Sequence, residues 1–364
     1  MPATAKINDV LERARRGRSD GAALAGRPWL VYGCGSTGRA WAESLAGAGA
    51  EVRAFVDRHA PDQQALRVLR PETCPASWKA ECSLLLGLHN PGVDIGAVRA
   101  ELQGLGFAHV VLLQELIARF PERSHFWLAP AAESLSAEDD ILAAHAELAD
   151  DASRHLFTAL LDQRLNAVAH GLPAPDPANA YLPPDLPLPA GLLRFVDCGA
   201  YTGDTIENFR CLGQRFAAVA AFEPDPAHYP RLAAALASEH AAIFPCGVWH
   251  RMEQLCFTTN DAASHIAVDG GSMIQTVSLD EALPGFAPTF IKMDIEGAEA
   301  HALDGARKTI AQHRPRLAIS AYHRPGDLWD LLRKIRQWDL GYRFHLRGHS
   351  FNGFDTVLYA LPDE

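Results

Sequence analysis

Two short stretches of the sequence have residue types, at a spacing, that could bind a nucleoside. Residues 195–205 (FVDCGAYTGDT) place Gly199 and Gly203 after an apolar run, and residues 221–225 (AFEPD) place Glu223 at the end of a second apolar run. Glycine lets the backbone approach a ligand in conformations that a side chain forbids, and the N–H groups at the start of the following helix point to the same place. A carboxylate at the tip of the next parallel strand can accept hydrogen bonds from both ribose hydroxyls.

Charge in the first stretch favours a cationic ligand. The turn is Asp-x-Gly-x-x-x-Gly, with Asp197 and Asp204 at positions where a loop that binds pyrophosphate would avoid negative charge. S-adenosylmethionine, which has a sulfonium, an amino group and a ribose, suits this turn better than a dinucleotide does. The alternative is an ordinary tight turn between a strand and a helix.

Composition excludes some classes of function. The chain of 364 residues has a formal net charge of −11, which disfavours nucleic acid as a partner because phosphate binding needs basic patches. No apolar run approaches the roughly 18 residues of a membrane span, and the first 20 residues lack the apolar core of a secretion signal. The seven cysteines are scattered without a Cys-x-x-Cys pair, which is typical of reduced thiols. We therefore expect a cytoplasmic protein with no membrane partner.

The elements that must position the nucleoside site belong to the second of two α/β domains. The chain is long enough for two domains of ordinary size. The expected segments are an N-terminal helix and connector (1–26), a small Rossmann-like domain (27–122), a helical and Pro-rich linker (123–191) and a second α/β domain (192–364). Within the linker we expect a helical tract from about 137 to 169, interrupted near Asp150 and Asp151.

Apolar runs predict the strands of the second domain. They lie at residues 193–198, 217–223, 242–248, 289–294, 317–321, 342–346 and 356–360. The turn-rich connector 347–355 has no room for a crossover helix, so the last two strands should pair antiparallel. A mostly parallel sheet closed by a terminal hairpin is the seven-stranded class I methyltransferase architecture, which binds its ligand at the carboxyl ends of the central strands.

The second domain resembles the FkbM family of S-adenosylmethionine-dependent methyltransferases. The resemblance lies in residues 195–205, 221–226 (AFEPDP), 290–299 (FIKMDIEGAE) and 341–344 (GYRF), and covers about residues 192–360. It implies S-adenosylmethionine as cofactor and methyl transfer to a hydroxyl of a small molecule such as a sugar or a secondary metabolite. The first half of the chain is similar to the extra nucleotide-binding-like domain of longer members.

The resemblance also implies contacts with the cofactor. By position, Asp197, Gly199 and Tyr201 would lie along the methionine part, Glu223 would hold the ribose, Cys246 and Gly247 would edge the adenine, and Asp294 would lie between cofactor and acceptor. Together with the rest of the two stretches, the expected cofactor-binding residues are Asp197, Gly199, Ala200, Tyr201, Gly203, Thr205, Glu223, Asp225, Cys246, Gly247 and Asp294.

Methyl transfer to a hydroxyl requires alignment of the acceptor and removal of its proton. The candidate bases are Asp294 and Glu296 after the fourth strand of this domain and His323 after the fifth. Because imidazole titrates near neutrality, we expect His323 to be the catalytic base and Asp294 to orient the acceptor or the base. The alternatives are a hydrogen-bonded loop histidine and, for Asp294, an N-cap of the following helix.

A metal is the second way to activate a hydroxyl. Asp294, Glu296 and Glu299, with His323, could bind a hard cation such as magnesium. Three acidic residues within one turn are common at helix starts without any ion, so we expect no metal.

The first domain contains a dinucleotide-binding fingerprint at Gly33, Gly35 and Gly38, with Asp57 following at the usual distance. The motif could equally serve helix–strand packing in a domain that only positions a substrate or partner. Two further hypotheses remain open: an NAD(P)-dependent sugar-modifying oxidoreductase or epimerase that works from this motif, and a non-catalytic protein that binds S-adenosylmethionine.

Overall fold

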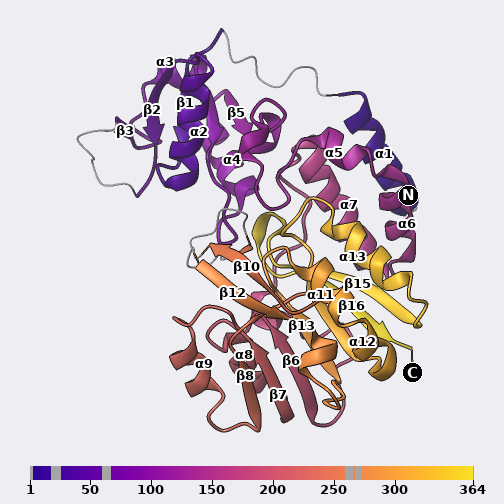
Figure 1. Ribbon diagram of the computed structural model, residues 1–364. Helices are drawn as coiled ribbons and strands as arrows, with labels where there is room; N and C mark the ends of the chain where they lie inside the picture. The colour runs from indigo at the N-terminus through magenta and orange to yellow at the C-terminus, as the bar shows by residue number, and fades with distance from the viewer. Residues whose placement is uncertain (1–2, 18–25, 60–66, 259–264, 267–271, 364) are drawn as a thin grey trace. The chain divides into compact units, whose positions relative to one another are not determined.

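The computed structural model describes residues 3–17, 26–59, 67–258, 265–266 and 272–363 (Figure 1). They divide into two compact units. Unit 1 contains residues 1–139, 155–175 and 350–354, and unit 2 contains residues 140–154, 176–349 and 355–364. In the described part of the chain, no helix has the length and hydrophobicity needed to cross a membrane.

Unit 1 is built on a five-stranded parallel sheet with the order β3-β2-β1-β4-β5. The strands are β1 (Trp29–Tyr32), β2 (Val52–Val56), β3 (Val68–Leu69), β4 (Ser83–Leu86) and β5 (His109–Leu112). The helices are α1 (Ala3–Arg15), α2 (Ser36–Gly47), α3 (Ala76–Glu81), α4 (Ile95–Gly104) and α5 (Ala131–Leu135), with short 3-10 turns at Leu113–Glu115 and Pro121–Arg123. Strands β1 and β4 are buried throughout because they lie in the middle of the sheet, which explains their continuous apolar sequences.

The expected linker is divided between the two units. The predicted break in the helical tract is confirmed, since α6 (Glu138–Glu147) ends before α7 (Asp151–Asn166) begins. After the 3-10 turn Pro177–Asn179, the Pro-rich segment packs into unit 2, where Leu182 and Leu186 are buried in the hydrophobic core. This segment is therefore a wrapping arm of the second α/β unit, held by leucines that alternate with its prolines.

Unit 2 contains the predicted seven-stranded sheet. Its order is β15-β16-β14-β13-β6-β7-β8, and β16 runs antiparallel to both of its neighbours, which confirms the terminal hairpin. The strands are β6 (Leu193–Cys198), β7 (Phe216–Phe222), β8 (Ala241–Phe244), β13 (Phe290–Met293), β14 (Arg316–Ser320), β15 (Tyr342–Gly348) and β16 (Thr356–Pro362). The helices are α8 (Asp204–Cys211), α9 (Tyr229–Ala235), α10 (Leu279–Ala282), α11 (Glu299–Gly305), α12 (Arg307–His313) and α13 (Asp327–Arg336). The 3-10 turn Phe351–Gly353, which lies between β15 and β16 in the sequence, belongs to unit 1.

The prediction of a single strand at residues 242–248 is wrong. Pro245 has no N–H to donate to a sheet, and the chain leaves the large sheet after β8. Residues Gly247–Val248 form β9, which pairs with β12 (Ser272–Val277) in a separate four-stranded sheet that also contains β10 (Glu253–Thr258) and β11 (His265–Ile266). This four-stranded sheet was not predicted from the sequence.

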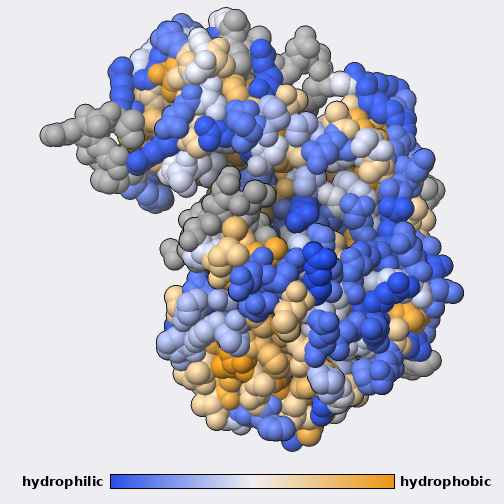
Figure 2. All heavy atoms as spheres, viewed as in Figure 1, coloured by the Kyte–Doolittle hydropathy of each residue, from blue (hydrophilic) through white to orange (hydrophobic). Residues whose placement is uncertain are grey.

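The surface of unit 2 is uneven in polarity. Figure 2 shows hydrophilic residues on the visible face where Figure 1 labels α12 and α13, and hydrophobic residues where it labels α8, β7 and β8. Strand β8 is the edge of the large sheet, and its Ala241 and Ala242 are exposed.

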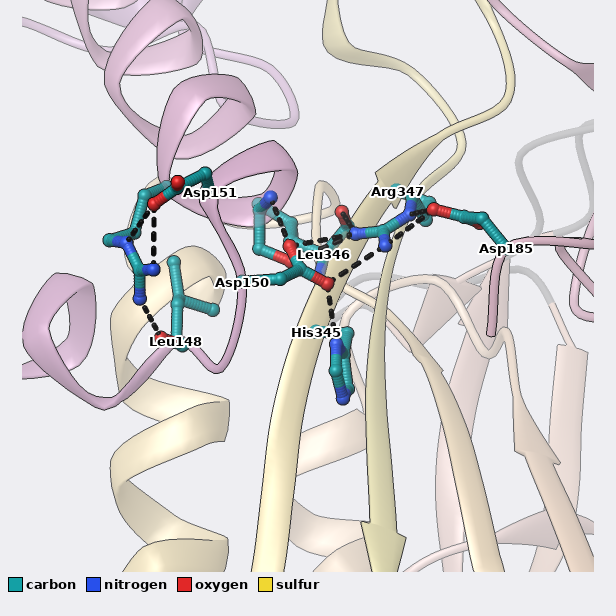
Figure 3. Close-up of polar contacts among 9 residues, drawn as sticks. Leu148, Asp150, Asp151, Asp185, His345, Leu346 and Arg347 are labelled. Atoms are coloured by element: carbon teal, nitrogen blue, oxygen red, sulfur yellow. Dashed lines mark hydrogen bonds and ion pairs between the residues drawn. The ribbon is translucent and has the colours of Figure 1, made fainter. Parts of the chain in front are cut away.

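Asp150 joins three separate segments of unit 2 (Figure 3). Its carboxylate accepts hydrogen bonds from the Ser153 N–H at 2.7 Å, which caps α7, and from His345 Nδ1 at 2.7 Å and Arg347 Nη2 at 2.9 Å on β15. Arg347 also donates from Nε to Asp185 at 2.9 Å. Burial acts to raise the pKa of Asp150, but the hydrogen bonds from Arg347, Ser153 and His345 outweigh it and hold the pKa below its usual range.

Replacing Asp150 by alanine should lower the free energy of unfolding by about 1–3 kcal/mol, because it removes the cap and two charge-assisted hydrogen bonds. Asp151→Ala is the matched control, since the Asp151 side chain is 93% exposed and pairs only with Arg154 among the described residues. Because the pKa of Asp150 is lowered in the folded protein, its contribution is complete above about pH 4 and is lost as the pH falls further. Urea unfolding at pH 7 and pH 3 measures both effects, and equal stability of the two variants at pH 7 would refute the role of Asp150.

Candidate cofactor and catalytic site

The turn after β6 requires glycine at two positions because of its backbone conformation and its close packing. Gly199 has φ +79°, and a Cβ there would lie 2.0 Å from the carbonyl oxygen of Asp294. Gly203 has φ +88°, and a Cβ there would lie 2.5 Å from Cβ of Ala235. Only glycine fits such positions without strain. The turn is thus pressed against the end of β13 on one side and α9 on the other.

Glu223 fastens this turn to the end of β7. Its Oε2 accepts the N–H of Tyr201 at 2.9 Å, and its Oε1 accepts the N–H of Asp225 at 2.8 Å. His228 Nδ1 lies 3.3 Å from the same Oε1, and its ring packs at 4.3 Å from that of Tyr201. Each carboxylate oxygen has two lone pairs, so both can accept a further hydrogen bond. Glu223 and the turn are therefore brought together as the sequence predicted.

Asp197 forms a buried ion pair with Lys292, which in turn binds the backbone of the turn. Its side chain is fully buried, and its Oδ1 lies 3.1 Å from Nζ of Lys292, which is also buried. The ammonium donates a hydrogen bond to the carbonyl of Gly199 at 2.6 Å. Burial raises the pKa of Asp197 to about 6, against the lowering effect of Lys292. Asp197 thus acts on the turn through Lys292, and a direct contact with methionine stays a prediction.

Lys292 is not among the residues predicted from sequence to form the site, although its position inside an apolar strand could have indicated it. It is the one charged residue of β13 (FIKM), a strand that is buried throughout. A lysine is almost never fully buried unless it is paired. A lysine inside an apolar strand next to a strand that contains Asp197 therefore indicates a buried pair.

The predicted catalytic residues lie together where β13 and β14 end. His323 Nε2 is 3.4 Å from Oδ1 of Asp294 and 3.6 Å from Oε2 of Glu296, and its Nδ1 is 2.9 Å from Oε1 of Glu299. The side chains of His323 and Glu299 are each 1% exposed, whereas those of Asp294 and Glu296 are 26% and 23% exposed. Of these four side chains, those of Asp294 and Glu296 are therefore the ones open to solvent.

The electrostatics of this group differ from those expected of a neutral histidine. Burial acts to lower the pKa of His323, but the carboxylates of Glu299, Asp294 and Glu296 raise it to about 10. Burial raises the pKa of Glu296 to about 7. Burial also acts to raise the pKa of Asp294, but Lys292 and His323 outweigh it and lower the pKa. The three carboxylates thus favour the protonated form of the imidazole, and the role of His323 as the base stays a prediction.

Geometry excludes one of the alternative interpretations, and the alternative of a hydrogen-bonded loop histidine stays open, since His323 Nδ1 lies 2.9 Å from Oε1 of Glu299. Helix α11 has its N-cap at Ala298 with no side-chain cap, so Asp294 does not cap it. Glu299 does have a local structural role, because its Oε1 accepts the N–H of Ile295 at 2.9 Å.

Tyr181 joins the group from the Pro-rich arm. Its hydroxyl donates to Oδ2 of Asp294 at 2.9 Å, and its backbone has φ +67°, which is uncommon for a residue with a side chain. Backbone strain of this kind is concentrated at functional sites. Tyr181 was not predicted from sequence, because its contact joins residues that are 113 positions apart and no local sequence motif indicates it.

The remaining cofactor candidates lie along the same edge of the large sheet or beside it. Ala200 and Thr205 are buried at the turn and the first turn of α8, and Asp225 accepts the N–H of Ala227 at 2.9 Å. Cys246 is buried between β8 and β9, and Gly247 begins β9. Their contacts with adenine stay predictions.

In unit 1 the fingerprint glycines form a tight turn after β1. Gly33 has φ +91°, and a Cβ on Gly38 would lie 1.9 Å from the carbonyl oxygen of Gly33. Asp57 accepts the N–H of Cys34 at 2.9 Å, while Gly35 precedes α2 without a side-chain cap. A cavity of about 280 Å³ lined in part by Thr37, His89 and Arg123 lies beside this helix. Packing thus explains Gly33 and Gly38, whereas a Cβ on Gly35 would have no atom within 4 Å. A nucleotide ligand stays a prediction.

Comparison with known proteins gives two results. Residues 197–345 match the family model described as the methyltransferase FkbM domain. A crystal structure of methyltransferase FkbM from Methylobacillus flagellatus KT is similar over 99% of each chain, with a TM-score of 0.79 and 22% sequence identity, which shows a shared fold. No curated protein matched the chain. Residues 197–345, which match this family model, contain the glycine turn, Glu223, Asp294 and His323.

Proposed function

We propose that the protein transfers a methyl group from S-adenosylmethionine to a hydroxyl of a small molecule such as a sugar or a secondary metabolite. One observation supports this most strongly. The glycine turn, Glu223, Asp294 and His323 follow the four adjacent strands β6, β7, β13 and β14, at their carboxyl ends. A ligand that binds at this edge can therefore contact all of them.

In the proposed reaction the acceptor oxygen attacks the methyl carbon in line with the departing sulfur. The C–S bond breaks, S-adenosylhomocysteine leaves, and the hydroxyl proton passes to the group formed by Asp294, Glu296 and His323. Glu223 holds the ribose, and the turn at residues 199–203 positions the methionine part. The enzyme contributes chiefly alignment and proton removal.

Replacing Glu223 by glutamine should weaken binding of S-adenosylmethionine by about 1–3 kcal/mol, because the ribose loses charge-assisted hydrogen bonds. Glu239→Gln is the matched control, since Glu239 is a partly buried carboxylate that pairs with Arg210 away from the turn. Isothermal titration of both variants measures the difference. An unchanged affinity in folded Glu223→Gln would remove Glu223 from the cofactor site.

The geometry of unit 1 gives less support to the oxidoreductase hypothesis. Asp57 already accepts hydrogen bonds from the N–H groups of Cys34 and His59, and packing explains Gly33 and Gly38. We therefore expect NAD and NADP to raise the melting temperature little. A shift that corresponds to micromolar affinity, together with redox turnover, would reinstate that hypothesis.

A further inference from the structure

We propose that the cavity beside α2 in unit 1 is a binding site for one sugar ring, which it recognises through hydroxyl groups. The cavity has a volume of about 280 Å³, and its lining includes Thr37, Ala40, Trp41, His89, Glu122 and Arg123. This volume lies just below the roughly 300–1,000 Å³ of most small-molecule sites, which suits a monosaccharide better than a dinucleotide. The lining residues all belong to unit 1, so the inference does not depend on the methyl transfer proposed for unit 2.

The cavity lies where the strand order of the parallel sheet reverses. From β1 the chain adds β2 and β3 on one side and then returns to add β4 and β5 on the other, which gives the order β3-β2-β1-β4-β5. Thr37, Ala40 and Trp41 belong to α2, which follows β1, and His89 follows β4. Open α/β sheets bind their ligands at such a point, outside the carboxyl ends of the strands.

Glycines bring the segments after β1 and β4 together. A Cβ on Gly87 would lie 2.8 Å from Cα of Gly38. A Cβ on Gly33 would lie 2.9 Å from Cδ2 of Leu88. The segment after β4 therefore packs closely against the turn after β1, which places His89 and α2 on the same cavity. Two glycines of the dinucleotide-binding fingerprint thus shape the cavity.

His89 has a buried nitrogen without a partner. Its Nε2 is buried and makes no hydrogen bond to any residue in the described part of the chain. The rings of Trp127 and Phe354 pack against the imidazole, with centroids at 5.0 and 4.8 Å. Burial, and to a smaller extent His125, lowers the pKa of His89 to about 3, so the imidazole is neutral near pH 7. A neutral imidazole has one donor and one acceptor nitrogen, and a hydroxyl can pair with either.

The other groups of the cavity favour hydroxyls over phosphate. Arg123 donates from Nε to Oγ of Ser44 at 2.7 Å, which fixes its guanidinium. Glu122 lines the same cavity, so its negative charge offsets that of Arg123 and would repel a phosphate. A guanidinium only donates hydrogen bonds, a carboxylate only accepts them, and the Thr37 hydroxyl does both, so sugar hydroxyls can satisfy all three. Trp41 offers apolar surface to the C–H groups of a sugar ring.

The test is saturation-transfer-difference NMR on the full-length protein with millimolar D-glucose, D-galactose and D-mannose. We expect saturation to pass from the protein to the C–H protons of at least one of these sugars, and an equal concentration of inorganic pyrophosphate should not displace it. Ala40→Phe puts a large side chain into the cavity and should abolish the transfer. Arg123→Met should weaken sugar binding at least about tenfold, because hydrogen bonds from a charged group are lost.

Ala46→Phe is the matched control, because Ala46 is an exposed residue of α2 that does not line the cavity. It should bind the sugar like the wild type. Circular dichroism identifies any variant that fails to fold, and folded Arg123→Met then decides without Ala40→Phe. Three results would each overturn the proposal: wild-type protein that gives no transfer to any of the three sugars, either folded cavity variant that binds the sugar as tightly as the wild type, or displacement of the sugar by pyrophosphate.

Discussion

Replacing His323 by glutamine should lower the turnover of methyl transfer by about 10²–10⁴-fold, the usual contribution of a positioned proton-transfer group. The imidazole lies within 3.6 Å of all three carboxylates of the site, and together with Lys292, whose effect is larger, it lowers the pKa of Asp294 against the effect of burial. Glutamine carries no charge and cannot take up or release a proton, so the carboxylates would repel one another and the hydroxyl would lose a group that takes part in proton transfer. The measurement is transfer of a radiolabelled methyl group from S-adenosylmethionine to a cognate acceptor.

The controls for His323 separate a chemical role from a structural one. The affinity for S-adenosylmethionine should be nearly intact, because His323 lies after β14 and Glu223 after β7. His301→Gln is the matched control, because His301 is a half-buried histidine outside this group that stacks on Trp249, and it should keep wild-type turnover. Loss of activity with EDTA that magnesium restores, together with activity that survives His323→Gln, would contradict the base assignment and favour a hard-cation mechanism.

Replacing Lys292 by methionine should lower the free energy of unfolding by about 3–5 kcal/mol, because it leaves the buried Asp197 carboxylate without its partner. Both side chains are almost fully buried and lie 3.1 Å apart. The double variant Asp197→Asn with Lys292→Met should recover much of this loss, since it removes both charges. Urea unfolding of the two single variants and the double variant gives the coupling energy.

If the losses in the free energy of unfolding of the two single variants add up in the double variant, the result would contradict a buried ion pair. So would a Lys292→Met protein as stable as the wild type. Lys334→Met serves as control, because Lys334 pairs with Asp304 in a more exposed position and should change stability by at most about 1 kcal/mol.

Much of the fold of unit 2 follows from local sequence. Apolar runs gave the seven strands closely, because a strand buried on both faces needs continuous hydrophobic residues. The short connector 347–355 decided the antiparallel hairpin. The error at residues 242–248 came from treating an apolar run as one strand although Pro245 interrupts it. The four-stranded sheet was not predicted, because some of its strands pair with strands that are not adjacent in the sequence.

The candidate site was predictable where it depends on backbone and not where it depends on long-range contacts. Gly199 and Glu223 follow directly from a turn and a strand tip. The partners Lys292 and Tyr181 reach the site from 93 and 113 residues away, and only packing brings them there. The pKa of His323 likewise depends on Glu299, whose burial the sequence does not reveal.

The proposed function requires that unit 2 binds S-adenosylmethionine at the glycine turn and Glu223. Isothermal titration of the wild-type protein with S-adenosylmethionine, S-adenosylhomocysteine, NAD and NADP tests it without knowledge of the acceptor. We predict saturable binding of the first two at one site, with no comparable binding of NAD or NADP. Binding of NAD or NADP alone, with no heat from S-adenosylmethionine or S-adenosylhomocysteine, would contradict the account.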